Sequence, residues 1–135
     1  MIILSKHMHK IIPFIQLIRL YNLMIIGFIM IVIKYALINI FIDDFCLDNV
    51  HFLILITITL LISASGYIIN DIYDVETDKI NKKKRRVIDV TISKKDAIKW
   101  YYIFNAISLI LALKLCIYIN SPILIFIFIF SIISL

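Results

Sequence analysis

Three long apolar runs restrict what this chain can fold into. They cover Leu20 to Ile42, His51 to Ile69 and Trp100 to Tyr118. Each is close to the roughly 20 residues that an α-helix needs to cross a bilayer core. Hydrophobic residues make up 63% of the 135 residues and charged residues 17%, a balance outside the usual range of soluble domains. The sequence therefore predicts an all-α integral membrane protein in direct contact with the lipid bilayer.

A fourth apolar run extends from Ile123 to Leu135. At about 1.5 Å per residue it reaches roughly 20 Å, which is short of a bilayer core of about 30 Å. We therefore expect one membrane domain with three full transmembrane helices and part of a fourth, a truncated bundle whose chain stops within a helix. The domain is expected over residues 1–135, with spans at about 20–42, 51–69, 100–118 and an incomplete 123–135.

The charged residues between these runs alternate in sign. Lysines precede the first run, the turn over residues 43–50 is acidic and free of Lys and Arg, and the stretch over residues 70–99 is basic. Because loops rich in Lys and Arg stay in the cytoplasm, we expect a cytoplasmic amino terminus and basic loop, in a bacterial inner membrane. The basic residues cluster beside the spans with few aromatics among them, so we expect no nucleic acid partner.

A few residues inside or beside the apolar runs carry information about packing. Lys34 interrupts the first run, and it either extends toward the membrane surface or faces the interior of a helix bundle. Small and hydroxyl-bearing residues between Thr57 and Gly66 predict close helix packing in the second run. Cys46 and Cys116 are isolated, which supports neither a zinc site nor a disulfide framework.

Candidate chemistry begins where the second run ends. Asn70, Asp71, Asp74 and Asp78 form the pattern NDxxDxxxD, and on a helix that continues through them they share one arc of the surface. Three carboxylates on one face repel one another unless a cation lies between them. Oxygen ligands without Cys or His favour Mg²⁺, Ca²⁺ or Mn²⁺ over zinc.

A basic run follows the aspartates directly. Its members are Lys79, Lys82, Lys83, Lys84, Arg85 and Arg86. Carboxylates that hold a metal, followed by cations that hold phosphate oxygens, indicate a site for a magnesium-bound polyphosphate. The alternative is a solvated, salt-bridged surface at the end of a membrane helix.

At these residues the sequence resembles the UbiA superfamily of intramembrane prenyltransferases. Asn70, Asp71, Asp74 and Asp78 match the family's first aspartate-rich motif in full. The flanking GYIIN and DKIN, and RLYNLM from Arg19 to Met24, are also similar to the family. The resemblance covers essentially the whole chain but only about the amino-terminal half of the family fold. It favours the branch that resembles geranylgeranylglycerol-phosphate geranylgeranyltransferases.

The resemblance implies a nine-helix bundle in which two aspartate-rich loops face one cavity. It implies that Asp71, Asp74 and Asp78 coordinate Mg²⁺ and act in catalysis. The same resemblance assigns diphosphate contacts to Asn22, Asn70, Lys82 and Arg85. Two features depart from the family: Lys83 and Arg86 stand where its loop has prolines, and the second aspartate-rich motif is not in the chain.

The activity implied is Mg²⁺-dependent transfer of an isoprenoid chain from an allylic diphosphate to an aromatic or glycerol-phosphate acceptor. The rings of Tyr67 and Tyr73 either stabilise the allylic cation or pack at the interface. One alternative is a truncated, catalytically incomplete remnant that keeps the diphosphate-binding loop, or a split half completed by a separate carboxyl-terminal half. A further alternative is a small membrane protein whose residues 82–86 bind anionic lipid head groups, which leaves the aspartate spacing unexplained.

Overall fold

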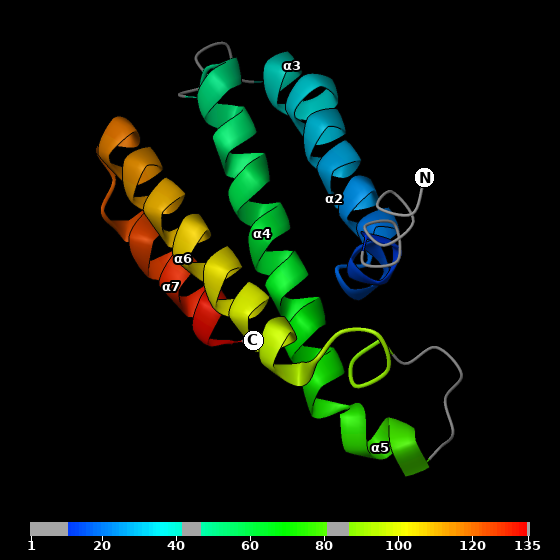
Figure 1. Cartoon of the computed structure of the whole chain (residues 1–135). Helices are drawn as coiled ribbons and strands as arrows, with labels where there is room; N and C mark the ends of the chain where they lie inside the picture. The colour runs from blue at the N-terminus through cyan, green and yellow to red at the C-terminus, as the bar shows by residue number, and fades with distance from the viewer. Residues whose placement is uncertain (1–10, 42–46, 81–86, 135) are drawn as a thin grey trace, which may run out of the picture.

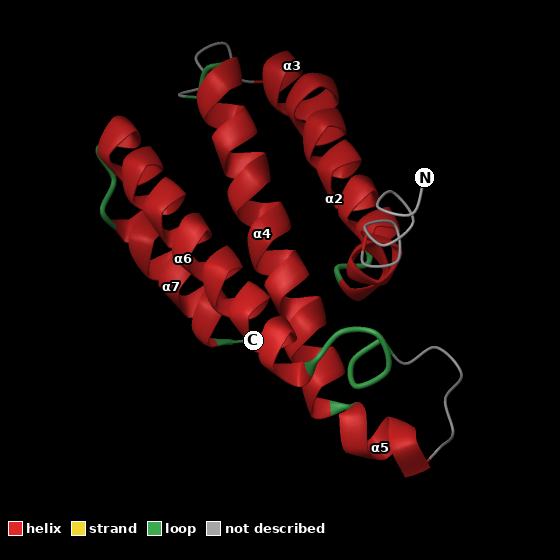
Figure 2. Cartoon of the chain, viewed as in Figure 1, coloured by secondary structure: helices red, strands yellow, loops and turns green. Residues whose placement is uncertain are grey.

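The computed structural model describes residues 11–41, 47–80 and 87–134, without the side chains of Asn39, Asp78 and Lys79. Regular structure in these ranges is helical, apart from one isolated bridge between Ile88 and Ile92. This confirms the all-α fold class (Figure 2). Residues 11–17 are helical, and the later elements are α2 (Leu20–Val32), the π-helix η1 (Ile33–Ile38), α3 (Asn39–Phe41), α4 (Asn49–Tyr73), α5 (Val75–Ile80), α6 (Lys94–Ile119) and α7 (Ile123–Ile133).

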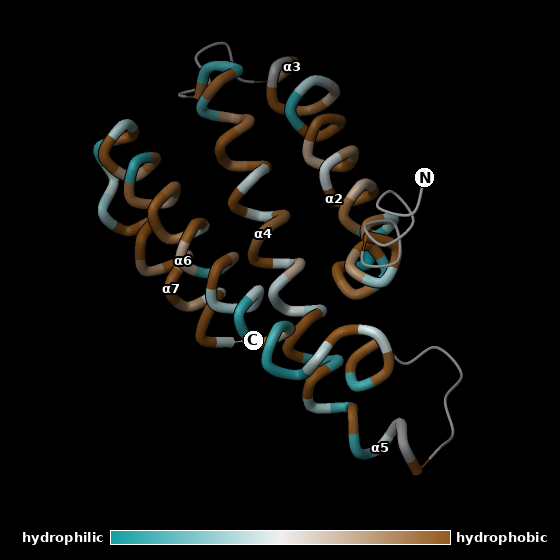
Figure 3. Tube along the Cα trace, in the orientation of Figure 1, coloured by the Kyte–Doolittle hydropathy of each residue, from teal (hydrophilic) through white to brown (hydrophobic). Residues whose placement is uncertain are grey.

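The helix α4 lies between α2 and α6, and α7 packs along α6 (Figure 1). Within the described ranges, α4, α6 and the continuous segment Leu20–Ile38 are long and apolar enough to cross a membrane, whereas α7 is a shorter apolar helix. Figure 3 shows hydrophobic residues along the middle of α4 and α6 and hydrophilic ones near their ends. Length and composition thus support an integral membrane protein.

Polar caps, not the limits of the apolar runs, set the ends of the long helices. Asp48 caps α4 by accepting a 2.8 Å hydrogen bond from the backbone N–H of His51. Ser93 caps α6 by accepting from the backbone N–H of Asp96 at 3.1 Å. Asn120 ends α6 in the left-handed conformation, with φ 54°, which asparagine tolerates better than most residues. Both helices therefore extend beyond the spans expected at 51–69 and 100–118.

The Asp48 cap makes the stability of the chain depend on pH. The backbone hydrogen bond from His51, and then the side-chain hydrogen bond from the same residue, lower the pKa of Asp48. A lowered pKa means that the carboxylate stabilises the fold above the ordinary pKa of Asp, near 3.9, and that this contribution is lost as the pH falls through the lowered value. We expect Asp48→Ala to lower the thermal unfolding temperature in detergent at pH 7. The gap to the native chain should close below about pH 4, and a gap that is constant with pH would contradict this account.

Two apolar clusters hold the bundle together. One lies between α4, α6 and α7 and includes Phe52, Ile56 and Leu115. The other, which we call the lower cluster, joins the helix at residues 11–17 to α4, α5, the loop before α6 and the first turn of α6. It consists of Leu17, Ile68, Ile72, Val75, Val87, Ile88 and Ala97. The lower cluster supports the segment that carries the aspartates.

Small residues bring α4 and α6 close together between these clusters. We call this contact the α4–α6 seam; it consists of Ala64, Ser65, Asn105, Ser108 and Ala112, all of them buried. The Ser65 hydroxyl lies 2.8 Å from the Ile62 carbonyl of its own helix and 3.2 Å from Asn105 Oδ1 across the seam. The Ser108 hydroxyl donates to the Asn105 carbonyl within α6 at 2.9 Å. Small side chains let helix backbones approach closely in lipid, and hydroxyl and amide groups link them.

Candidate functional site

The aspartate motif spans the joint between α4 and α5. The helix α4 ends at Tyr73 and α5 begins at Val75, so one residue, Asp74, separates them. The shared arc expected from the sequence assumed a helix that continues through the motif. Asp74 departs only modestly from helical geometry, with φ −76° and ψ −7°. Its backbone N–H still donates to the Asn70 carbonyl at 2.9 Å. The joint therefore changes the helix direction (Figure 1) without losing this hydrogen bond.

The same joint separates apolar from polar side chains. Ile68, Ile72 and Val75 follow one another at helical spacing and are buried in the lower cluster. Asp74 is exposed and Asp71 is partly exposed. Because residues three and four apart share one helix face, Asp71, three residues after Ile68 and four before Val75, borders the buried face, and Asp74 lies farther out toward solvent. Packing of the lower cluster thus presents the carboxylates at the end of α4.

Asp71 is paired with an arginine from the start of α2. Arg19 Nη2 lies 2.9 Å from Asp71 Oδ1, with the two side chains 44% and 26% exposed. The guanidinium carbon of Arg19 also lies 4.9 Å from the centroid of the Tyr67 ring, within the range of a cation–π contact. Arg19 was not among the site residues expected from the sequence, although it begins the RLYNLM segment that resembles the family.

Arg19 has an uncommon backbone conformation. Its φ of 50° and ψ of 54° place it in the left-handed region, at a cost of roughly 1–2 kcal/mol for a non-glycine residue. Its N–H donates to the Gln16 carbonyl at 3.1 Å, while its own carbonyl accepts from the N–H of Asn22 at 2.8 Å. Arg19 therefore joins the helix at residues 11–17 to α2.

The other predicted site residues are distributed as follows. Asn22 is exposed in the first turn of α2, and Asn70 is exposed in the last turn of α4. Tyr73 is 76% exposed, so its ring contributes little to packing within the described chain. The backbone of Asp78 belongs to α5, but its side chain, together with Lys82 and Arg85, lies outside the described residues.

No group of three or more His, Cys, Asp or Glu side chains gathers among those that the structure describes. Asp71 and Asp74 are the motif carboxylates in that part of the chain, and they offer oxygen donors only. One of them already has a cation beside it. A carboxylate set of this kind fits a hard divalent cation such as Mg²⁺.

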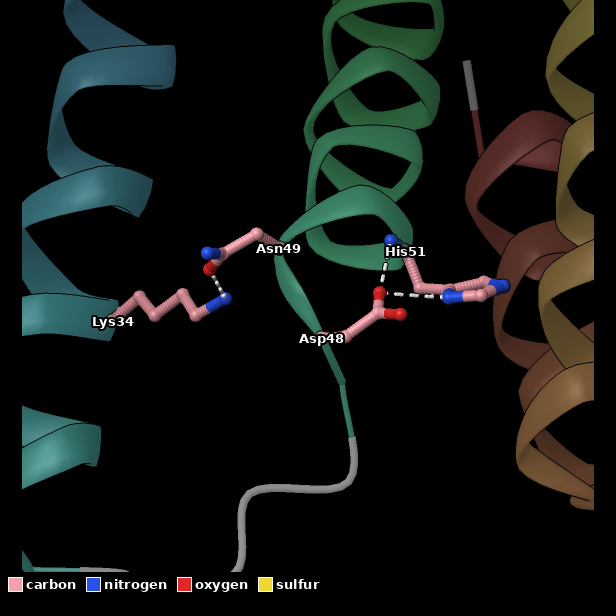
Figure 4. A network of polar contacts seen from close by, with 4 residues as sticks. All are labelled: Lys34, Asp48, Asn49 and His51. Carbon is pink, nitrogen blue, oxygen red and sulfur yellow. Dashed lines mark hydrogen bonds and ion pairs between the residues drawn. The ribbon is translucent and has the colours of Figure 1, made fainter.

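Lys34 forms a separate polar contact at the other end of α4. It is 3% exposed, and its Nζ donates to Asn49 Oδ1 at 3.0 Å, as Figure 4 shows. Its Nζ also lies 4.5 Å from the centroid of the Phe52 ring. Lys34 therefore faces the interior, the second of the two placements that the sequence allowed. At 1.5 Å per residue, this contact is about 33 Å along α4 from Asp71.

Apolar helices of membrane-spanning length, with carboxylates at the end of one of them, define an integral membrane protein with a polar site near its surface. Residues 35–135 match the UbiA prenyltransferase family, and the chain belongs to this family. The resemblance seen in the aspartate motif is thereby confirmed.

Curated relatives share one name, digeranylgeranylglyceryl phosphate synthase. The relative from Hyperthermus butylicus is 30% identical over 83% of this chain and 36% of its own length. The relative from Methanocaldococcus jannaschii is 37% identical over 58% of this chain and 26% of its own length. The relative from Sulfolobus acidocaldarius is 42% identical over 41% of this chain and 20% of its own length. The chain thus spans about a third or less of the relatives it matches. No solved structure matches it.

Proposed function

We propose that this chain binds the Mg²⁺ complex of an allylic diphosphate at the joint between α4 and α5, as part of an intramembrane prenyltransferase. The observation that carries the proposal is the pair of motif carboxylates, partly exposed Asp71 and exposed Asp74, at the end of a helix long and apolar enough to cross a membrane. Membership in the UbiA prenyltransferase family supports the same function.

Each predicted site residue has a role in this proposal. Asp71, Asp74 and Asp78 hold the metal ion, and Asn70 and Asn22 supply amide groups at the polar mouth. Lys82 and Arg85 bind the diphosphate oxygens by charge-assisted hydrogen bonds. The exposure of Asn22 and Asn70 is consistent with contact with a ligand that arrives from the membrane surface.

The reaction breaks the bond between the allylic carbon and the diphosphate oxygen. The diphosphate leaves with the bonding electrons, the acceptor oxygen or carbon forms a new bond to the allylic carbon, and the acceptor loses a proton. A bound divalent cation supplies electrostatic stabilisation of the leaving diphosphate. Cationic side chains share that charge, and apolar helix faces keep water away from the reactive carbon.

The names of the relatives favour one substrate pair. A digeranylgeranylglyceryl phosphate carries two geranylgeranyl groups, so we propose geranylgeranyl diphosphate as the donor. A glyceryl phosphate that already carries one geranylgeranyl group is the proposed acceptor. An aromatic acceptor is the other candidate.

The test is binding of geranylgeranyl diphosphate to the detergent-solubilised chain. We expect binding in excess Mg²⁺ and at least about 100-fold weaker binding after chelation with EDTA, because removal of the metal should cost no less than loss of one of its ligands. Geranylgeraniol, which lacks the diphosphate, is the matched control and should bind equally with and without Mg²⁺.

The outcomes separate the proposal from its alternatives. Binding of geranylgeranyl diphosphate that does not depend on Mg²⁺ would contradict the proposed site. Mg²⁺-dependent binding with transfer to the acceptor would support the full activity. Mg²⁺-dependent binding without transfer would favour the alternative in which this chain holds the diphosphate and acts with a separate carboxyl-terminal half.

A further inference from the structure

Arg19 lies beside Asp71, one of the proposed metal ligands. Its Nη2 lies 2.9 Å from Asp71 Oδ1, the distance of a charge-assisted hydrogen bond. A metal ion at Asp71 would therefore either displace the guanidinium from Oδ1 or bind Oδ2 beside a like charge, which is unfavourable.

The contact between Arg19 and Asp71 has a fixed geometry, but the ion pair itself contributes little free energy. The left-handed backbone at Arg19 is a strained conformation, of the kind that collects at ligand-binding and switch positions. The ring of Tyr67, 4.9 Å from the guanidinium carbon, supports the side chain from α4. The pair itself is 44% and 26% exposed, and exposed ion pairs shift equilibria by no more than about fivefold.

We propose that Arg19 is a place-holding cation. In the ligand-free protein it neutralises Asp71, and it gives up this carboxylate when the metal binds. The proposal rests on the proposed function, because it takes Asp71 as a metal ligand. Arg19 acts through Asp71, so it is a positioning residue. Its weak, exposed ion pair offsets the charge of the carboxylate without preventing metal entry.

A purely structural role is the competing explanation, in which Arg19 fastens α2 to α4. The structure provides a second polar link between the first membrane segment and α4, because Lys34 in η1 bonds to Asn49. Leu60 and Ile56 of α4 also approach Gly27 of α2 closely. Removal of the Arg19 contact should therefore leave these elements docked.

The experiment is a titration of the detergent-solubilised full chain with Mn²⁺, followed by electron paramagnetic resonance. We expect Arg19→Gln to lower the Kd for Mn²⁺ two- to fivefold, by removing the competitor. Lys99→Gln is the matched control: it also removes one positive charge, but Lys99 lies 3.8 Å from Asp96 rather than beside the motif. The Kd of Lys99→Gln for Mn²⁺ should equal that of the native chain. Tyr67→Leu, which removes the support of the guanidinium, should lower the Kd by less than Arg19→Gln.

The proposal would be overturned if Arg19→Gln has a native circular dichroism spectrum and its Kd for Mn²⁺ is unchanged or higher. An equal decrease of the Kd in Lys99→Gln would also overturn the proposal, because removal of any nearby positive charge would then strengthen Mn²⁺ binding. If Arg19→Gln does not fold, the Kd of Tyr67→Leu for Mn²⁺ tests the proposal instead. A Kd of Tyr67→Leu equal to that of the native chain would contradict the proposal. A native chain that binds no Mn²⁺ in the absence of diphosphate refutes this inference, as does native Mn²⁺ binding that the variants do not strengthen. The proposed function fails separately, if geranylgeranyl diphosphate does not bind in a Mg²⁺-dependent way.

Discussion

Asp71→Asn is expected to weaken Mg²⁺-dependent binding of geranylgeranyl diphosphate by at least about 100-fold. Loss of a residue that only supports a metal ligand already costs about 10- to 100-fold in metal affinity, and a direct ligand should cost no less. Asparagine keeps the shape of the side chain and removes its charge. Asp74→Asn should have a similar effect, because both carboxylates lie on the exposed face of the α4–α5 joint. Isothermal titration of the detergent-solubilised chain measures both variants.

Asp96→Asn is the matched control for this comparison. Asp96 is an exposed carboxylate in the first turn of α6, beside Ala97, which packs in the lower cluster under the aspartate motif. Asp96→Asn removes the same charge as Asp71→Asn, at the same end of the bundle. Asp96, however, bonds to Ser93 as part of a helix cap. If Asp96→Asn weakened binding as much as Asp71→Asn, a general loss of negative charge would explain the result, and the motif would not be a specific site.

The membrane class and the helical fold could be predicted because they depend on composition and on the length of apolar runs. The ends of the helices could not, since hydropathy reports the lipid-facing stretch while polar caps end the helix. The end of α4 illustrates this: Asn70, Asp71 and Tyr73 lie beyond the apolar run, yet α4 continues to Tyr73. The aspartate motif was visible because its spacing is local and follows helical periodicity.

The contacts that organise the two ends of α4 were not predictable from local pattern. Arg19 and Asp71 are 52 positions apart, and Lys34 and Asn49 are 15 apart. Periodicity gives the face on which a residue lies and says nothing about which distant residue faces it. The predicted first span also contains the π-helical segment Ile33–Ile38, a type that occurs mostly as single turns inside helices and often at functional positions. Here it carries the buried Lys34 toward α4.

Ser65→Leu is expected to destabilise the chain by about 3 kcal/mol, the largest stability effect that we predict. Ser65 is 0% exposed, as are Ser108 and Ala112 across the α4–α6 seam. A leucine has no space there without separating the helices, and overpacking of this kind typically costs about 1–3 kcal/mol. The substitution also removes the hydroxyl that lies 2.8 Å from the Ile62 carbonyl and 3.2 Å from Asn105 Oδ1, and loss of a buried hydrogen-bond partner adds about 1–3 kcal/mol at most.

Unfolding in mixed micelles with increasing SDS, followed by circular dichroism, measures this effect. Thr57→Leu is the matched control, because Thr57 is exposed on the same helix and its hydroxyl donates to the Leu53 carbonyl of its own helix. It should change stability by less than about 0.5 kcal/mol, as surface substitutions usually do. Equal stability of Ser65→Leu and Thr57→Leu would mean that α4 and α6 do not pack through the seam. Since the seam lies six residues, or about 9 Å, from Asp71 along α4, a separated seam should also weaken diphosphate binding.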